Sequence, residues 1–211
     1  MFKDRENAAK KLAQSIQDHD ISLTNAVVIG ITRGGAVVGK IVAEELGLLF
    51  DIIVIKKIGS PHNPELAIGA VGPKNTTYYN KAILSNLHIL PSDLLLYSTY
   101  KQKERISLEE KLRVHKKPVK LFGKDVVVVD DGVATGASVF CALESIAKQK
   151  PARTILAVPV ISSEIQKKLA SKVDMLLALV VAKQFEAVGN YYQKFPEVDD
   201  DEVMVLLSSK Q

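Results

Sequence analysis

Residues 126–138 read VVVVDDGVATGAS, in which two acidic side chains follow an apolar run and small, hydroxyl-bearing residues come next. The four valines predict a strand that is buried on both faces of a parallel sheet. Asp130 and Asp131 stand where that strand would end, and Gly132 begins a turn. The apolar spacing after Ser138 is typical of a helix. A carboxylate pair and a helix N-terminus are therefore expected to meet at the end of one strand.

This arrangement of strand, short loop and helix predicts an anion site. The first N–H groups of the helix have no partner within it, and the helix macrodipole adds partial positive charge there. Ala134, Gly136 and Ala137 are small enough to let a phosphate approach the backbone. The hydroxyl groups of Thr135 and Ser138 can donate further hydrogen bonds. Hydrogen bonds to a charged group contribute about 1.5–3 kcal/mol each, so several can hold a phosphate monoester without a basic residue in the loop.

The two aspartates suit a different part of a ligand. Asp130 and Asp131 would repel a phosphate, but they can accept hydrogen bonds from neighbouring hydroxyl groups. A ribose 5-phosphate fits both features, with its phosphate in the loop and its 2- and 3-hydroxyl groups on the carboxylates. The alternative is an ordinary buried strand that ends in a polar turn. The complete order of apolar strand, two acids, spacer, Thr-Gly and small residues resembles the phosphoribosyl-pyrophosphate (PRPP) motif of the type I phosphoribosyltransferases.

The resemblance implies an α/β fold, that of the type I phosphoribosyltransferases, with a mostly parallel central sheet flanked by helices and a small C-terminal hood. It implies transfer of the 5-phosphoribosyl group of PRPP to a nitrogenous base, as in nucleobase salvage, with release of pyrophosphate. Mg²⁺ would be bound mainly through PRPP, with Asp130 and Asp131 as candidate ligands. The family also leads us to expect a homodimer.

The chain alternates predicted strands and helices, which is typical of a parallel sheet with right-handed crossovers. Apolar runs predict strands at residues 26–31, 50–55, 66–71, 126–129, 154–160 and 174–181. Helical spacing predicts helices at residues 3–19, 37–46, 91–115 and 139–146, and a terminal helix after residues 199–202. The charged residues of the 91–115 helix, with Glu109 and Arg113 four apart, favour a solvated face. We expect one domain over residues 1–211, with a core at about 20–181 and a hood at about 182–211 to which the N-terminal helix could contribute.

Loops after parallel strands gather at one edge of a sheet, so the loops after the first, second and central strands are expected to converge. After the first strand, Arg33, Gly34 and Gly35 offer a guanidinium group and glycine N–H groups that suit a pyrophosphate. The segment resembles the pyrophosphate loop of the family, although Arg-Gly-Gly alone is also a common tight turn.

After the second strand, Lys56 and Lys57 resemble the basic pair at the start of the family's mobile loop, which contacts pyrophosphate and closes over the reacting centre. Here that loop would span residues 57–66. The alternative is a solvated strand end. Because consecutive strand residues point to opposite faces, at most one lysine should face the ligand, and Lys56 is preferred. His62 and Glu65, in the same loop, are expected to be solvated.

The tail FEAVGNYYQKF resembles the hood segment that covers the nucleobase in purine phosphoribosyltransferases. Phe185 is the candidate for stacking on the base, with Tyr191 second, although aromatic residues near a C-terminus are more often part of a core. Lys183 resembles a lysine that reads a purine carbonyl in the 6-oxopurine enzymes. Those enzymes usually carry Asp where this chain has Ala134, which leaves the acceptor base undefined.

The charge balance points to a small anionic ligand at least as well as to nucleic acid. The chain has 28 basic and 24 acidic residues, largely interspersed, and a formal net charge of +4, so no nucleic-acid partner is expected. Cys141 is the only cysteine, which excludes an intrachain disulfide and favours a reducing cytoplasm. No apolar run reaches transmembrane length and charges interrupt the N-terminus, so we expect no membrane partner.

Other function classes lack their fingerprints. No GxGxxG follows the first strand, no GxxxxGKS/T occurs, and the His and Cys residues make no zinc-ligand spacing. A second hypothesis stays open: a PRPP- or nucleotide-sensing regulator that kept the binding motif without turnover and could bind nucleic acid. The segments KIGSPHNPELAIGA and FEAVGNYY resemble those of uncharacterised bacterial phosphoribosyltransferase-like proteins, and that resemblance spans nearly the whole chain.

Overall fold

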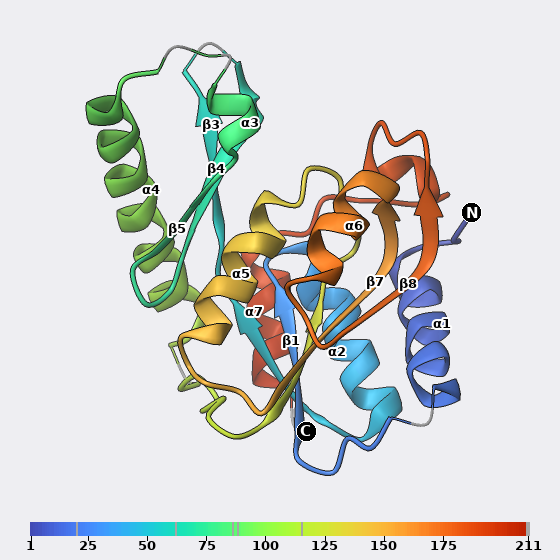
Figure 1. Ribbon diagram of the computed structural model, residues 1–211. Coiled ribbons are helices and arrows are strands. Elements are labelled where there is room, and N and C mark those ends of the chain that lie inside the picture. Colours follow the sequence, from blue (N-terminus) through green and yellow to red (C-terminus); the bar gives the residue numbers. More distant parts are fainter. Residues whose placement is uncertain (20, 62, 86, 88, 115, 210–211) are drawn as a thin grey trace.

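The structure is a computed structural model that describes residues 1–209 except residues 20, 62, 86, 88 and 115, and leaves the side chains of residues 64 and 65 undescribed. Five parallel strands form the central sheet in the order β2-β1-β6-β7-β8 (Figure 1). They are β1 (Ala26–Ile31), β2 (Leu49–Ile53), β6 (Asp125–Val129), β7 (Arg153–Ser162) and β8 (Met175–Ala182). The parallel sheet predicted from the alternating pattern is confirmed.

Helices cover both faces of this sheet (Figure 1). One face packs on α1 (Arg5–Asp18), α2 (Gly34–Leu46) and α7 (Asp200–Ser208), and the other on α5 (Ala137–Ala147) and α6 (Ser163–Ala170). Alternate valines of β6 enter the two cores: Val127 and Val129 join the first, Val126 and Val128 the second. Burial on both faces explains the unbroken valine run, since each buried valine contributes about 1.5–3 kcal/mol.

A second, antiparallel sheet projects from the body as an arm (Figure 1). Its strands are β3 (Lys56–Ser60), β4 (Asn63–Gly72) and β5 (Thr76–Tyr79), and its helices are α3 (Lys81–Leu84) and α4 (Pro91–Leu112). The loop predicted at residues 57–66 is instead a hairpin, because β3 and β4 pair with each other there. Ile58 and Ile68 are buried in a core shared with α4, which accounts for the pairing. His62 lies outside the described residues.

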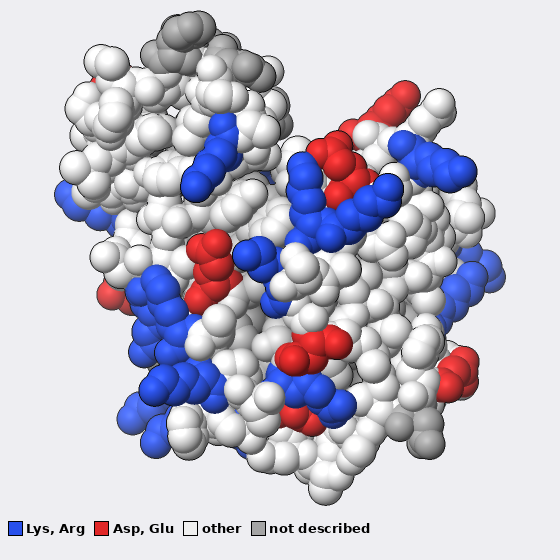
Figure 2. Space-filling model, viewed as in Figure 1, with Lys and Arg blue, Asp and Glu red and all other residues white. Residues whose placement is uncertain are grey.

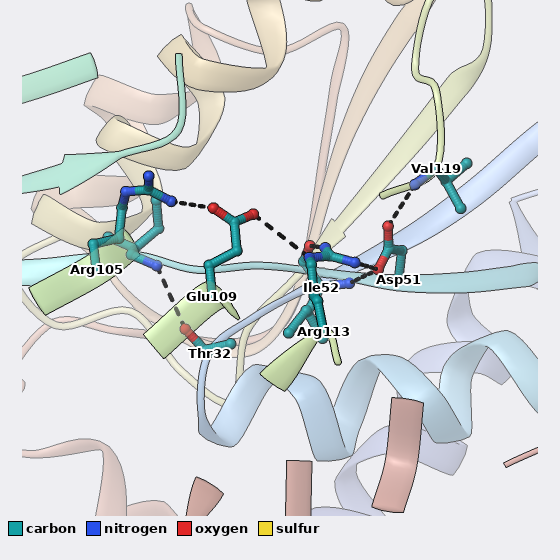
Figure 3. Close-up of polar contacts among 8 residues, drawn as sticks. Thr32, Asp51, Ile52, Arg105, Glu109, Arg113 and Val119 are labelled. Carbon is teal, nitrogen blue, oxygen red and sulfur yellow. Dashed lines mark hydrogen bonds and ion pairs between the residues drawn. The ribbon is translucent and has the colours of Figure 1, made fainter. Parts of the chain in front are cut away.

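Buried ion pairs anchor α4 and the residue that follows it to β2 (Figure 3). Arg113 donates from Nη1 to Asp51 at 2.8 Å and from Nη2 to the carbonyl of Ile52 at 2.7 Å. Glu109 pairs with both Arg105 and Arg113. The side chains of Asp51 and Arg113 are only 2% and 8% exposed. The solvated face predicted for the charges of this segment was therefore wrong for Arg105, Glu109 and Arg113, because the fold supplies a buried carboxylate from a distant strand. Lys103, Glu110 and Lys111 are exposed, as predicted.

The N-terminal segment meets the segment around Tyr192 beside the sheet. Phe2 forms a bridge with Tyr192, and the backbone N–H of Gln193 donates to the carbonyl of Phe2 at 2.9 Å. The short 3-10 helix η1 (Val188–Tyr191) precedes this contact. The helix α7 lies elsewhere, against α2, α4 and β2. The first part of the predicted hood and the N-terminus therefore approach the sheet edge considered below, and α7 reaches it through Asp200, which lies 3.8 Å from Arg33.

Within the part of the chain that the structure describes, no helix combines the length and apolarity required to cross a membrane. Acidic and basic side chains are interspersed over most of the face shown in Figure 2, apart from a group of Lys and Arg at its lower left. Most of that face therefore lacks the continuous basic surface that is typical of nucleic-acid binding.

Candidate active site

A cleft of about 300 Å³ opens at the carboxyl end of β1 and β6. Its lining comes from residues 31–34, from Lys57 on the arm, from residues 130–139, and from Val188 and Phe195 of the tail. The convergence of loops predicted at this edge of the sheet is confirmed for these segments, because the parallel strands β1 and β6 end side by side.

The carboxylate pair forms the floor of this cleft. The backbone N–H of Asp131 donates to Oδ1 of Asp130 at 2.9 Å, and Nε of Arg5 donates to Oδ2 of Asp131 at 2.8 Å. Burial raises the pKa of Asp130 well above its ordinary value of 3.8, and the charge of Asp131 raises it further. Burial also raises the pKa of Asp131, but the guanidinium group of Arg5 opposes that shift. The pair is thus costly to ionise in the free protein.

The phosphate loop predicted from sequence lines the cleft along its whole length, from Ala134 through Thr135, Gly136 and Ala137 to Ser138. Gly136 has a φ of 75°, a left-handed conformation that favours glycine, and α5 begins at the next residue. No side chain in the described part of the chain caps this helix. Its first N–H groups are therefore available to an anion.

The loop after β1 lies against the carboxylates. A Cβ atom on Gly34 would lie 1.8 Å from Oδ2 of Asp131, and one on Gly35 would lie 2.8 Å from Oδ1 of Asp130. Only glycine fits at these two close approaches. Arg33, whose side chain is 43% exposed, reaches Glu197 at 3.3 Å. Arg33 and Gly34 line the cleft, whereas Gly35 is buried behind it and is not part of the lining.

The two lysines of β3 point in different directions. Lys57 lines the cleft, and its charge lowers the pKa values of both Asp130 and Asp131. Lys56 is not part of the lining, and its charge acts on Glu104 of α4. Only one of the two lysines lines the cleft, as predicted from the alternation of strand residues. That residue is Lys57, so the preference for Lys56 was wrong. The register of the β3–β4 hairpin, which the sequence pattern did not reveal, decides which lysine faces inward.

The tail contributes residues that sequence reasoning did not single out. Val188 and Phe195 line the cleft, and a methyl group of Val188 would lie 2.5 Å from a Cβ atom placed on Gly132. Phe185 and Tyr191 instead pair with each other, with ring centroids 5.2 Å apart, and neither lines the cleft. The predicted stacking residues therefore lie outside the cleft in this conformation, because their rings pack against each other within the tail.

Lys183 is exposed and is not part of the cleft lining either. Tyr192, by contrast, is buried, and its hydroxyl group donates to the carbonyl of Asp131 at 2.6 Å. Arg5 and Tyr192 both reach the acid pair from parts of the chain that are far from it in sequence. No spacing rule connects them to residues 130–138, so only the folded chain reveals them.

Comparison with known families agrees with this geometry. The model of the phosphoribosyl transferase domain matches residues 2–193. The chain belongs to the phosphoribosyl transferase domain family. The matched range includes the acid pair, the phosphate loop, Tyr192 and every residue of the cleft lining except Phe195.

Similar proteins support the same assignment. The Mycobacterium tuberculosis H37Rv protein named "Putative phosphoribosyl transferase Rv0571c" is 33% identical over 210 residues, which cover 98% of this chain and 46% of the relative. This phosphoribosyltransferase domain thus spans about half the length of the curated relatives that it matches. The crystal structure of TT1426 from Thermus thermophilus is 37% identical, with a TM-score of 0.81 and coverage of 98% of this chain and 97% of TT1426.

A more distant structure shares the fold alone. AQ2163 from Aquifex aeolicus is 14% identical, with a TM-score of 0.52 and coverage of 88% of this chain and 78% of that one. The predicted fold class is confirmed: this is a type I phosphoribosyltransferase fold with a parallel central sheet flanked by helices.

Proposed function

We propose that this domain transfers the 5-phosphoribosyl group of PRPP to a nitrogenous base and releases pyrophosphate. The observation that carries the proposal is the placement of two half-buried carboxylates next to the uncapped N-terminus of α5 within one cleft. The 5-phosphate would lie on residues 134–138, and the ribose hydroxyl groups on Asp130 and Asp131. Arg33, Gly34 and Lys57 would contact the pyrophosphate.

The donor set fits Mg²⁺ when the substrate is counted. No cluster of three or more His, Cys, Asp or Glu residues that could hold a metal occurs in the described part of the chain. Mg²⁺ is commonly bound through one or two carboxylates together with substrate phosphates, which Asp130, Asp131 and PRPP can provide. The ion would neutralise charge on the departing pyrophosphate.

The residues of the cleft can each perform one part of the reaction. As pyrophosphate leaves, positive charge builds on the ribose ring, and the carboxylates of Asp130 and Asp131 stabilise it. Arg33 and Lys57 carry positive charges to the pyrophosphate side. Val188 and Phe195 add apolar surface to the lining, which would disfavour water that could hydrolyse the activated sugar. The acceptor base would enter on this apolar side, and the reaction needs no catalytic histidine.

The proposal predicts a specific biochemical result. Wild-type protein is incubated with PRPP, Mg²⁺ and a panel of purines, pyrimidines and their analogues, and pyrophosphate release is measured. At least one base is expected to support release, and Asp131→Asn is expected to abolish it. No release with any base, together with binding of PRPP by calorimetry, would contradict turnover and favour the regulator. A size-exclusion measurement in the same buffer tests the homodimer that we also propose.

The arm supplies a prediction with an internal control. Lys57→Ala is expected to weaken PRPP binding about 10–100-fold, since a hydrogen bond to a charged group contributes about 1.5–3 kcal/mol. Lys56→Ala removes an adjacent lysine of the same strand that lies outside the cleft lining, so binding should change less than about twofold. Isothermal titration with PRPP and MgCl₂ measures both. An equal loss in the two variants would contradict the geometric assignment.

A further inference from the structure

Arg5, the first residue of α1, makes three contacts around the acid pair. Its Nε donates to Oδ2 of Asp131 at 2.8 Å, and its Nη1 donates to the carbonyl of Pro196 at 2.7 Å. The guanidinium carbon lies 3.7 Å from the centroid of the Phe195 ring, over its face. The side chain is only 9% exposed. Arg5 therefore connects the N-terminal helix, the tail and the floor of the cleft.

These contacts hold Asp131 by one oxygen. Arg5 donates a hydrogen bond to Oδ2, so Oδ1 can accept one from a ligand hydroxyl group or bind a cation. The hydroxyl group of Tyr192 donates to the backbone carbonyl of the same residue at 2.6 Å, so Arg5 and Tyr192 together fix both its side chain and its main chain. Arg5 itself is fixed by its stacking on Phe195 and its bond to Pro196. A planar guanidinium can satisfy all these partners at once, whereas an ammonium group cannot.

We propose that Arg5 is a positioning residue for Asp131: it orients the carboxylate toward the ribose hydroxyl groups and links that carboxylate to the tail through Phe195 and Pro196. This inference rests on the proposed function. Arg5 is not part of the cleft lining, so it acts through Asp131 rather than by touching the sugar. Its removal should weaken PRPP binding through the misplacement of Asp131, even though no direct contact to PRPP is lost.

A matched control exists at the other end of the central strand. Arg153 donates from Nη2 to Asp125 at 2.7 Å, a partly buried Arg–Asp pair at the start of β6 and β7, opposite the cleft. Arg153→Gln removes the same kind of charge pair without touching the acid pair. A general loss of stability would affect this variant as well, whereas a loss of positioning would affect only Arg5→Gln.

The first measurement is titration calorimetry with PRPP and MgCl₂. Arg5→Gln is expected to bind PRPP about 10–100-fold more weakly, by analogy with the loss when a residue that orients a metal ligand is removed. Arg5→Lys should lose less affinity, because it keeps a positive charge beside Asp131. Arg153→Gln should bind PRPP as tightly as the wild type. Adding Arg5→Gln to Asp131→Asn should cause little further loss. Wild-type affinity in Arg5→Gln, or full additivity with Asp131→Asn, would overturn the inference.

The second measurement, amide hydrogen exchange in the free protein, separates this inference from the proposed function. Residues 130–136 are expected to exchange faster in Arg5→Gln than in the wild type or Arg153→Gln. If wild-type protein gave no heat with PRPP, the proposed function would fail, and the exchange pattern alone would decide whether Arg5 positions Asp131. Unchanged exchange at residues 130–136 would overturn the positioning role whatever the calorimetry shows.

Discussion

Asp130→Asn is expected to unfold at a higher temperature than the wild type at pH 7, while losing the proposed transferase activity. Burial and the charge of Asp131 raise the pKa of Asp130 well above 3.8 in the folded protein. At neutral pH this carboxyl group therefore lowers the stability of the folded state relative to the unfolded chain. Asparagine removes the charge and keeps an oxygen that can accept the N–H of Asp131, which now donates at 2.9 Å. Each kcal/mol of relief raises Tm by about 2–4 °C in a domain of this size.

The sign of the pH dependence follows from proton binding. Below pH 3.8 the Asp130 carboxyl group is protonated in both states, so the wild type suffers no penalty. As the pH rises, the unfolded chain releases this proton first, and the stability of the wild type falls until the raised pKa of the folded state is passed. The Tm difference between Asp130→Asn and the wild type should therefore be small near pH 4 and should grow toward neutral pH.

Thermal unfolding at pH 4 to 8 tests this expectation, and pyrophosphate release tests the activity. We expect a loss of about 10²–10³-fold in turnover, which is typical when one electrostatic group at the reacting centre is removed. Asp125→Asn, at the start of the same strand, is the control, and it should lower Tm because Arg153 loses its partner. A lower Tm in Asp130→Asn at every pH would show that the carboxylate stabilises the fold and would contradict the prediction.

Asp51→Ala is expected to cause the largest loss of stability among the ion pairs described. It leaves the guanidinium group of Arg113 and the N–H of Val119 without the carboxylate that each contacts at 2.8 Å. Removing one partner of a buried ion pair costs about 3–5 kcal/mol, because the remaining charge stays buried. Urea unfolding measures the change. Since the network also fastens α4 to the body, the arm that carries Lys57 should exchange its amide protons faster.

A double variant distinguishes a buried charge from a simple packing defect. Asp51→Ala combined with Arg113→Met removes both charges, and it should recover much of the stability that Asp51→Ala loses. Glu164→Gln, which breaks the exposed pair with Lys168, should leave stability nearly unchanged. If Asp51→Ala destabilised no more than Glu164→Gln, the network in Figure 3 would not anchor α4.

The sequence by itself determined the central sheet and the phosphate loop. The valines of β6 are apolar at every position because both faces are buried, and this property is visible in a run of four residues. Residues 134–138 are small or carry hydroxyl groups, which suits the approach of a phosphate to the start of α5, and that pattern is also local. Where the physical cause lies within a few neighbouring residues, the pattern predicted the structure, and the family resemblance drew on the same residues.

Only the tertiary structure decided which distant residues hold the acid pair and anchor the arm. Arg5 lies 126 positions from Asp131 in the chain, and Asp51 lies 62 positions from Arg113, so no periodicity links the partners. Lys57 rather than Lys56 lines the cleft because of the register of the β3–β4 hairpin. The turn-forming residues of that segment had predicted a loop instead. A buried charge is stabilised by whichever group the fold brings to it, and that partner is set by packing rather than by local sequence.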